Sequence, residues 1–267
     1  MDVNRFKSII EYSRVNLDEI EVKIRKFCAV MNIRSDSDVR DVLLLVREVF
    51  LRRGFIVFEM PFMDDEIGAL CYKGDGLGYV VINSSLPRVN NNFAVAHEIY
   101  HVFFQENEFK SKIEFANEYY YESEDEYAAN IFAGALLMPE NSFRGMFDKF
   151  RGESQGISDT ICKLMNYYQT PYMATLIRCC ELQLIDMKEM SGELMFVNKE
   201  DVFEKFDELW LDKSIFQPSC RDDFPNVERL VGNIGKEYIE GGYINQRTFD
   251  MVITNIRTLS KRIRGKE

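Results

Sequence analysis

The sequence predicts an α+β fold, in which a small three-stranded sheet packs on helices and a mainly helical C-terminal region follows. Three short apolar segments, at residues 55–60, 67–72 and 78–83, are typical of strands. Before and after them, apolar residues recur at helical spacing. With 267 residues, the chain is long enough for one large domain or two small ones.

The N-terminal residues favour helices that precede the sheet. Residues 3–30 alternate apolar and charged side chains at helical spacing, which predicts two short helices. A second amphipathic pattern covers residues 39–52, and Gly54 ends it. Pro61 ends the first predicted strand, and glycines between the second and third strands suit a tight hairpin. Such a sheet needs helices to cover its apolar side.

Residues 93–104 predict a buried helix with one polar interruption, His97-Glu98-x-x-His101. The chain has only two histidines, and both lie here. Residues four apart share a helix face, with Cβ atoms about 5–6 Å apart, so two imidazoles can bind one metal ion. Glu98 can then reach a water bound to that ion. The alternative, a structural histidine pair, would bury polar groups among apolar neighbours at a high cost.

A third ligand is expected in residues 122–139, an acidic helix start followed by small apolar residues. With no histidine left, this ligand must be a carboxylate or a thiolate, and two histidines with one glutamate form a known catalytic zinc set. Glu126 and Asn130 are four apart, so we expect Glu126 to bind the metal and Asn130 to hold a ligand in place. The alternative carboxylate ligands are Glu122, Glu124 and Asp125. If they do not bind the metal, their negative charges suit the positive end of the helix dipole.

Tyrosines near these motifs are candidates for a catalytic hydroxyl. Tyr100 lies inside the first motif, and residues 105–121 predict a loop or a frayed helix over the site. Three consecutive tyrosines end that stretch: Tyr119, Tyr120 and Tyr121. We interpret them as packing groups, with donation to a developing oxyanion as the alternative.

The C-terminal part predicts helices without a recognisable site. We divide the chain at residues 1–150, 151–190 and 191–267, because residues 151–156 have the composition of a linker. Residues 157–185 predict two helices. Three further amphipathic helices are expected near residues 202–211, 227–238 and 246–264, and their role is not indicated.

Composition excludes several classes of function. The formal net charge of −11 disfavours nucleic-acid and anionic-membrane binding. No apolar stretch approaches the roughly 20 residues of a membrane span, and no secretion signal begins the chain, so we expect a cytoplasmic protein. The six cysteines form no C-x-x-C pair, which favours reduced thiols over a cysteine metal site.

Two motifs together resemble the ImmA/IrrE family of metallopeptidases. They read Phe93-x-x-Ala96-His97-Glu98-x-x-His101 and Glu126-x-x-Ala129-Asn130-x-Phe132-Ala133-x-x-Leu136-Leu137-Met138-Pro139. The resemblance covers residues 39–150 and implies a zincin-like core. It also implies that His97, His101 and Glu126 bind Zn²⁺, with Mn²⁺ as an alternative, and that Glu98 is the general base. Tyr100 departs from the family, whose members often have glycine there, and it narrows the cleft on that side.

The resemblance implies a zinc-dependent endopeptidase of the bacterial or phage cytoplasm. Its expected substrate is a helix-turn-helix transcriptional repressor, whose cleavage relieves repression under stress. Residues 157–185 resemble the helix-turn-helix-like element that follows the peptidase core in this family. We do not expect them to bind DNA, because they lack a basic stripe. The alternative function is a non-catalytic, metal-stabilised regulator that binds a partner, and the presence of Glu98 argues against it.

Overall fold

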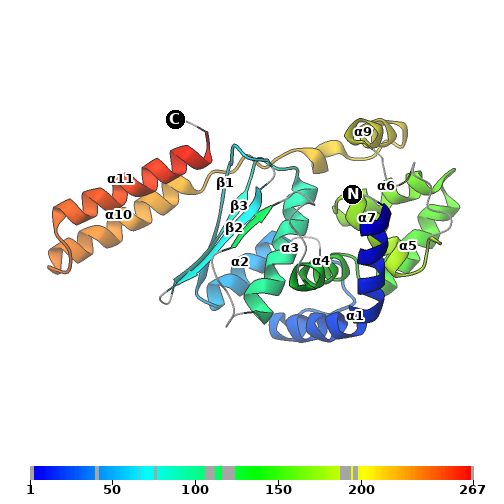
Figure 1. Cartoon of the computed structure of the whole chain (residues 1–267). Helices are drawn as coiled ribbons and strands as arrows, with labels where there is room; N and C mark the ends of the chain where they lie inside the picture. The colour runs from blue at the N-terminus through cyan, green and yellow to red at the C-terminus, as the bar shows by residue number, and fades with distance from the viewer. Residues whose placement is uncertain are drawn as a thin grey trace.

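The computed structural model describes most of the chain, namely residues 3–39, 42–65, 67–74, 77–105, 112–115, 124–186, 194 and 198–265. A mixed sheet divides the molecule (Figure 1). Helices α2, α3 and α4 lie on one side of the sheet, and a pair of helices, α10 and α11, projects from the other side. The predicted α+β class is confirmed.

The N-terminal helix α1 (Val3–Met31) is continuous, so the prediction of two short helices was wrong. The segment contains no glycine or proline to end a helix. Figure 1 shows that the first part of α1 turns sharply against the second, so both parts reach the core. Phe6 and Ile10 are buried in the first part, and Ile24 and Phe27 in the second. Helix α2 (Val42–Arg52) follows.

The sheet has the strand order β1-β3-β2-β4. The strands are β1 (Phe55–Met60), β2 (Ile67–Gly74), β3 (Leu77–Asn83) and β4 (Lys112–Phe115). β1 runs parallel to β3, and β2 runs antiparallel to both β3 and β4. The three predicted strands are present. β4 is an addition, in a stretch that we expected to be a loop or a frayed helix.

Helices α3 (Arg88–Phe104) and α4 (Glu124–Leu137) pack together beside the sheet. On α3, Val95, Ile99 and Val102 join the core cluster that also contains sheet residues. On α4, Ala129 and Ala133 are fully buried, and such small side chains let α1 and α3 approach closely. This contact between α3 and α4 is what positions the predicted site.

The remaining helices follow in two groups. The first packs in the main core: α5 (Glu140–Gly152), α6 (Ile157–Tyr168) and α7 (Tyr172–Glu181). The second group is α9 (Lys199–Glu208), the 3₁₀ helix η2 (Lys213–Phe216), α10 (Phe224–Glu240) and α11 (Gln246–Ile263). The division at residues 150 and 190 stays a prediction. Within the described ranges, no helix has both the length and the apolar character needed to cross a membrane.

The six cysteines all lie within the described residues, where none forms a disulfide, and all except Cys220 are buried. Burial raises the pKa of Cys162 and Cys180 to about 12. At neutral pH these two thiols are therefore protonated, and a protonated thiol is a poor metal ligand.

Candidate metal centre

On helix α3, every residue of the motif His97-Glu98-x-x-His101 is buried. His97, Glu98 and His101 each expose 2% or less of their surface, although all three are polar. The helix is unbroken from Arg88 to Phe104, so the two histidines stack on one face with ring centroids 4.8 Å apart. Their Nε2 atoms approach to 2.9 Å. Two imidazoles thus meet at a single point inside the molecule.

The first turn of α4 brings Glu126 to the same point. Its Oε2 atom lies 3.1 Å from Nε2 of His97 and 3.5 Å from Nε2 of His101. One ligand atom from each of the three residues lies within 4.8 Å of the other two. Glu124 and Asp125, the rival carboxylates on α4, are exposed, and Glu122 lies outside the described residues. The geometry therefore brings together the set predicted from the two motifs.

Two side-chain amides orient the imidazoles. Nδ1 of His97 donates to Oδ1 of Asn130 at 2.9 Å, and Nδ1 of His101 donates to Oε1 of Gln105 at 2.6 Å. An amide oxygen only accepts hydrogen bonds, so each Nδ1 carries the proton. A neutral imidazole protonated at Nδ1 has its lone pair on Nε2. Both Nε2 lone pairs then point toward the Glu126 carboxylate.

The charge on Glu126 completes this donor set. Burial by itself raises the pKa of Glu126, but a proton held on Nε2 of His101 or His97 outweighs it and keeps that pKa well below its usual range, because the imidazole then donates to the carboxylate. Glu126 is thus a carboxylate at neutral pH. A carboxylate and two imidazole lone pairs repel one another unless a cation lies between them. Two nitrogens and one oxygen suit a divalent metal such as Zn²⁺ and leave a position for water.

Glu98 and Tyr100 occupy different surroundings on α3. Glu98 directly follows His97 and is 2% exposed. The hydroxyl of Tyr100 accepts a hydrogen bond from Nζ of Lys23 on α1 at 2.9 Å. The ring of Tyr100 lies edge-on to His101, with centroids 5.8 Å apart. Tyr100 therefore contacts a predicted ligand through its ring and α1 through its hydroxyl. Tyr119, Tyr120 and Tyr121 lie outside the described residues.

Gln105 is a site residue that sequence reasoning missed. It lies four residues after His101, the same spacing that led us from Glu126 to Asn130. It also ends α3, where its backbone N–H donates to the carbonyl of His101 at 3.0 Å. The spacing was a usable signal, but we assigned Gln105 to the polar stretch after the helix.

Comparison with known proteins identifies the part of the chain that holds this centre. Residues 51–179 match the model of the peptidase M78 family, described as the IrrE N-terminal-like domain. Among solved structures, a Mycobacterium tuberculosis transcriptional regulator matches with 14% identity and a TM-score of 0.45, over 65% of this chain and 51% of that one. The chain thus spans about half the length of that protein. No curated protein matches the chain.

Proposed function

We propose a peptidase function for this chain, whose residues 51–179 belong to the ImmA/IrrE family of metallopeptidases. The specific proposal is a zinc-dependent endopeptidase, with Mn²⁺ as the alternative metal. The observation that carries it is the convergence of His97, His101 and Glu126, with Glu98 beside them on α3. The family supports a protein substrate.

The proposed chemistry assigns one task to each residue. Zn²⁺ held by the two histidines and Glu126 would lower the pKa of a bound water and polarise the scissile carbonyl. Glu98 would be the general base that accepts a proton from the attacking water on a carboxylate oxygen and passes it to the leaving amine. Asn130 and Gln105 hold the imidazoles in the required tautomer.

An oxyanion donor is the remaining part of the mechanism. Tyr100 is our candidate among the described residues, because its ring contacts His101. Its hydroxyl is engaged by Lys23, so it donates to an oxyanion only after it leaves that lysine. A Tyr100→Phe variant separates the two roles: loss of turnover with normal metal content supports donation, and unchanged turnover assigns the ring to packing.

We infer that the substrate is a helix-turn-helix repressor in the bacterial or phage cytoplasm, and that its cleavage relieves repression under stress. The family resemblance of the two motifs supports this inference. The net charge of −11 also supports it, because an acidic protein attracts a basic DNA-binding protein and repels DNA.

A helix-turn-helix repressor found among the products of the neighbouring genes is the substrate that tests the proposal. The purified protein should cut it, and a chelator should stop the reaction. Glu98→Gln should lower turnover by at least about 100-fold while the metal content stays unchanged. Glu124→Gln makes the same chemical change at an exposed position on α4 and should leave turnover unchanged. Normal turnover in Glu98→Gln would remove Glu98 from the mechanism.

The same assay distinguishes the alternative function. A non-catalytic regulator would bind the repressor in a metal-dependent way and leave it intact. Mass spectrometry of the recovered repressor decides between the two functions, because cleavage adds one water to the products and binding leaves the mass unchanged.

A further inference from the structure

Asp38, in the segment between α1 and α2, has a carboxylate that the chain satisfies on one side only. Its Oδ2 atom accepts a hydrogen bond from the hydroxyl of Tyr167 on α6 at 3.0 Å. Its Oδ1 atom is buried and accepts no hydrogen bond from any described residue. Among the residues that the structure describes, no lysine or arginine forms an ion pair with this carboxylate. A buried carboxylate oxygen without a partner is costly, so a donor from outside the chain would stabilise it.

A cavity of about 110 Å³ lies beside this carboxylate. Its lining residues are Asp38, Val39, Tyr167, Tyr168 and Gln169. The two tyrosine rings stand nearly perpendicular, at 76°, with centroids 4.8 Å apart. A carboxylate attracts a positive charge, and the faces of aromatic rings attract organic cations. The lining therefore favours a ligand that combines a positive charge with some apolar surface.

The fold holds the wall of this cavity in place. Tyr168 is 6% exposed, and its hydroxyl shares a hydrogen bond with Oγ of Ser142 on α5 at 2.8 Å. Gln169 ends α6 with φ 53°, and its carbonyl accepts from Nδ2 of Asn92 on α3 at 3.2 Å. Burial raises the pKa of Tyr168, and the nearby Asp38 carboxylate raises it further, so this phenol stays neutral. A ligand would thus enter a cavity whose groups are already positioned, which lowers the cost of binding.

Size and charge together narrow the ligand to a small organic cation. The cavity is well below the roughly 300 Å³ of ordinary ligand pockets, so it is too small for a nucleotide or a similar cofactor. It offers one carboxylate, whereas Ca²⁺ takes roughly six to eight oxygen ligands, which argues against a bare metal ion. No basic side chain is among the described residues of its lining, so an anion would be repelled. A primary ammonium group has three N–H donors for the carboxylate, and its alkyl chain suits the rings.

We propose that this cavity, here called the Asp38 cavity, binds a primary ammonium group on a short alkyl chain. The nitrogen donates to the Asp38 carboxylate, and the chain packs against Tyr167 and Tyr168. A free alkylamine and a lysine side chain of a partner protein share this chemistry. The net charge of −11 also favours a cationic ligand over an anionic one. This proposal is independent of the peptidase function.

Calorimetric titration of the full-length protein with n-butylamine tests the proposal. At neutral pH this amine is an ammonium ion, and it should bind with a Kd of about 0.1–10 mM, as expected of so small a ligand. 1-Butanol has nearly the same shape without the charge and should bind at least about 10-fold more weakly. N-acetyl-lysine methylamide carries the same ammonium chain on a peptide unit. Equal affinity for it would identify a protein lysine as a ligand, and binding of n-butylamine alone would identify a free amine.

A matched pair of variants assigns the binding to Asp38. Asp38→Asn keeps the shape of the side chain and removes its charge, so it should weaken the binding of n-butylamine by at least about 10-fold. Asp36→Asn makes the same change two residues away, at an exposed position that does not line the cavity. It should bind the amine as the wild type does.

Three results would overturn the proposal. If neither amine binds up to about 100 mM, the cavity holds water only. Equal affinity of the wild type for n-butylamine and 1-butanol would remove the charge from the recognition. Equal affinity of the wild type and Asp38→Asn for n-butylamine would place the amine elsewhere. Far-UV circular dichroism checks that the variants fold, and the comparison with 1-butanol needs only the wild type, so the test stands even if Asp38→Asn does not fold.

Discussion

Helices α4 and α10 differ in how many of their sides are covered. Nine of the fourteen residues of α4 are buried, and they cover nearly every direction around the helix. Helix α10 has seventeen residues, but only Gly235 is buried. The difference follows from sequence: α4 is apolar on all sides, and α10 is apolar along one broad stripe. A helix of the first kind has its neighbours on all sides within the fold, and one of the second kind leaves an apolar side in solvent.

This difference also explains where the proposed metal centre lies. Glu126 and Asn130 belong to a helix that α1, α3 and α7 hold on several sides. Their side chains are therefore fixed before any metal binds, and pre-arranged ligands favour tight binding. Helices α10 and α11 have no such enclosure, and polar contacts fix them only where they leave and return to the sheet.

The largest expected effect is on the enclosed helix. Phe132 is fully buried and lies against Phe27, Tyr100 and Phe104. Phe132→Ala should lower the free energy of unfolding by about 3–5 kcal/mol, because it leaves a cavity that rigid neighbours cannot fill. Urea denaturation measures this loss. A loss below about 1 kcal/mol would mean that α4 is not as tightly enclosed as its burial indicates.

Removing one orienting amide should have the next largest effect. Asn130→Ala or Gln105→Ala frees an imidazole to rotate, which should weaken zinc binding by about 10–100-fold. Competition with a fluorescent chelator measures the affinity. Asn233→Ala removes an exposed amide from α10 and serves as the control. Equal affinities in all variants would show that the ligands keep their orientation without the amides.

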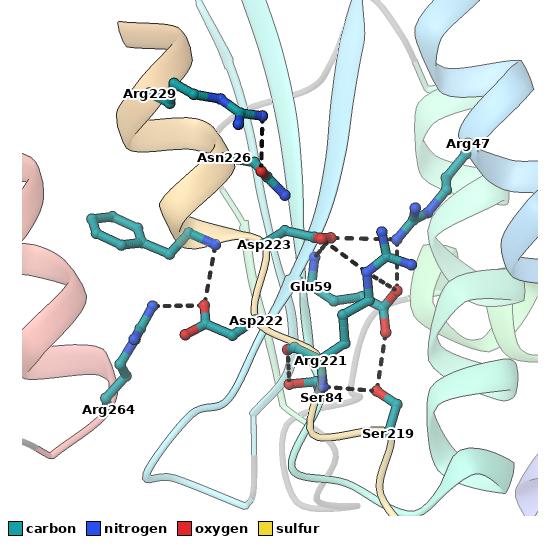
Figure 2. A network of polar contacts seen from close by, with 11 residues as sticks. Arg47, Glu59, Ser84, Ser219, Arg221, Asp222, Asp223, Asn226, Arg229 and Arg264 are labelled. Atoms are coloured by element: carbon teal, nitrogen blue, oxygen red, sulfur yellow. Dashed lines mark hydrogen bonds and ion pairs between the residues drawn. The ribbon is translucent and has the colours of Figure 1, made fainter. Parts of the chain in front are cut away.

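The junction between β1 and the start of α10, where Asp223 bonds to Glu59 (Figure 2), should respond to acid. Burial raises the pKa of Asp223, but the N–H of Glu59 and the guanidinium of Arg221 outweigh it and lower that pKa below its usual value. The resulting stabilisation is present above pH ~4, the unfolded pKa of aspartate, and is lost as the pH falls through the folded pKa.

Asp223→Asn isolates this contribution. The difference in unfolding free energy between the wild type and this variant should shrink as the pH falls from about 5 to about 3. If the difference stays constant over that range, the effect comes from the changed shape of the side chain and not from its charge.

The smallest effect on the unfolding free energy is expected on the exposed apolar side of α10. Leu230→Ala on α10 should change the unfolding free energy of the monomer by less than about 0.5 kcal/mol, because this side chain is already largely solvated. A loss of unfolding free energy comparable with that of Phe132→Ala would mean that α10 is enclosed as tightly as α4.

Local patterns predicted the elements that build the centre. Strands β1, β2 and β3 were evident because each is a short apolar run between turn residues, and the motifs on α3 and α4 have characteristic spacings. β4 was missed although Lys112-Ile113-Glu114-Phe115 alternates as a strand does, because the run is only four residues long. The single helix α1 was missed although its covered apolar side chains, from Phe6 and Ile10 to Ile24 and Phe27, keep helical spacing along its length.

Contacts between distant residues had no comparable signal. The pairing of Arg47 with Glu59 and Asp223 joins α2, β1 and the start of α10, and no sequence spacing connects these three positions. On α10, the side that packs against α11 and the side that is exposed to solvent are equally apolar in sequence. Only the packing of α11 along one of them distinguishes the two.

Metal content measured after gel filtration tests the central claim most directly. The account predicts one Zn²⁺ per wild-type chain, near-complete loss of it in Glu126→Gln, and full retention in Asp125→Asn, whose carboxylate is adjacent but exposed. Full zinc occupancy in Glu126→Gln, or a wild-type chain that binds no divalent metal when supplied with it, would contradict the account.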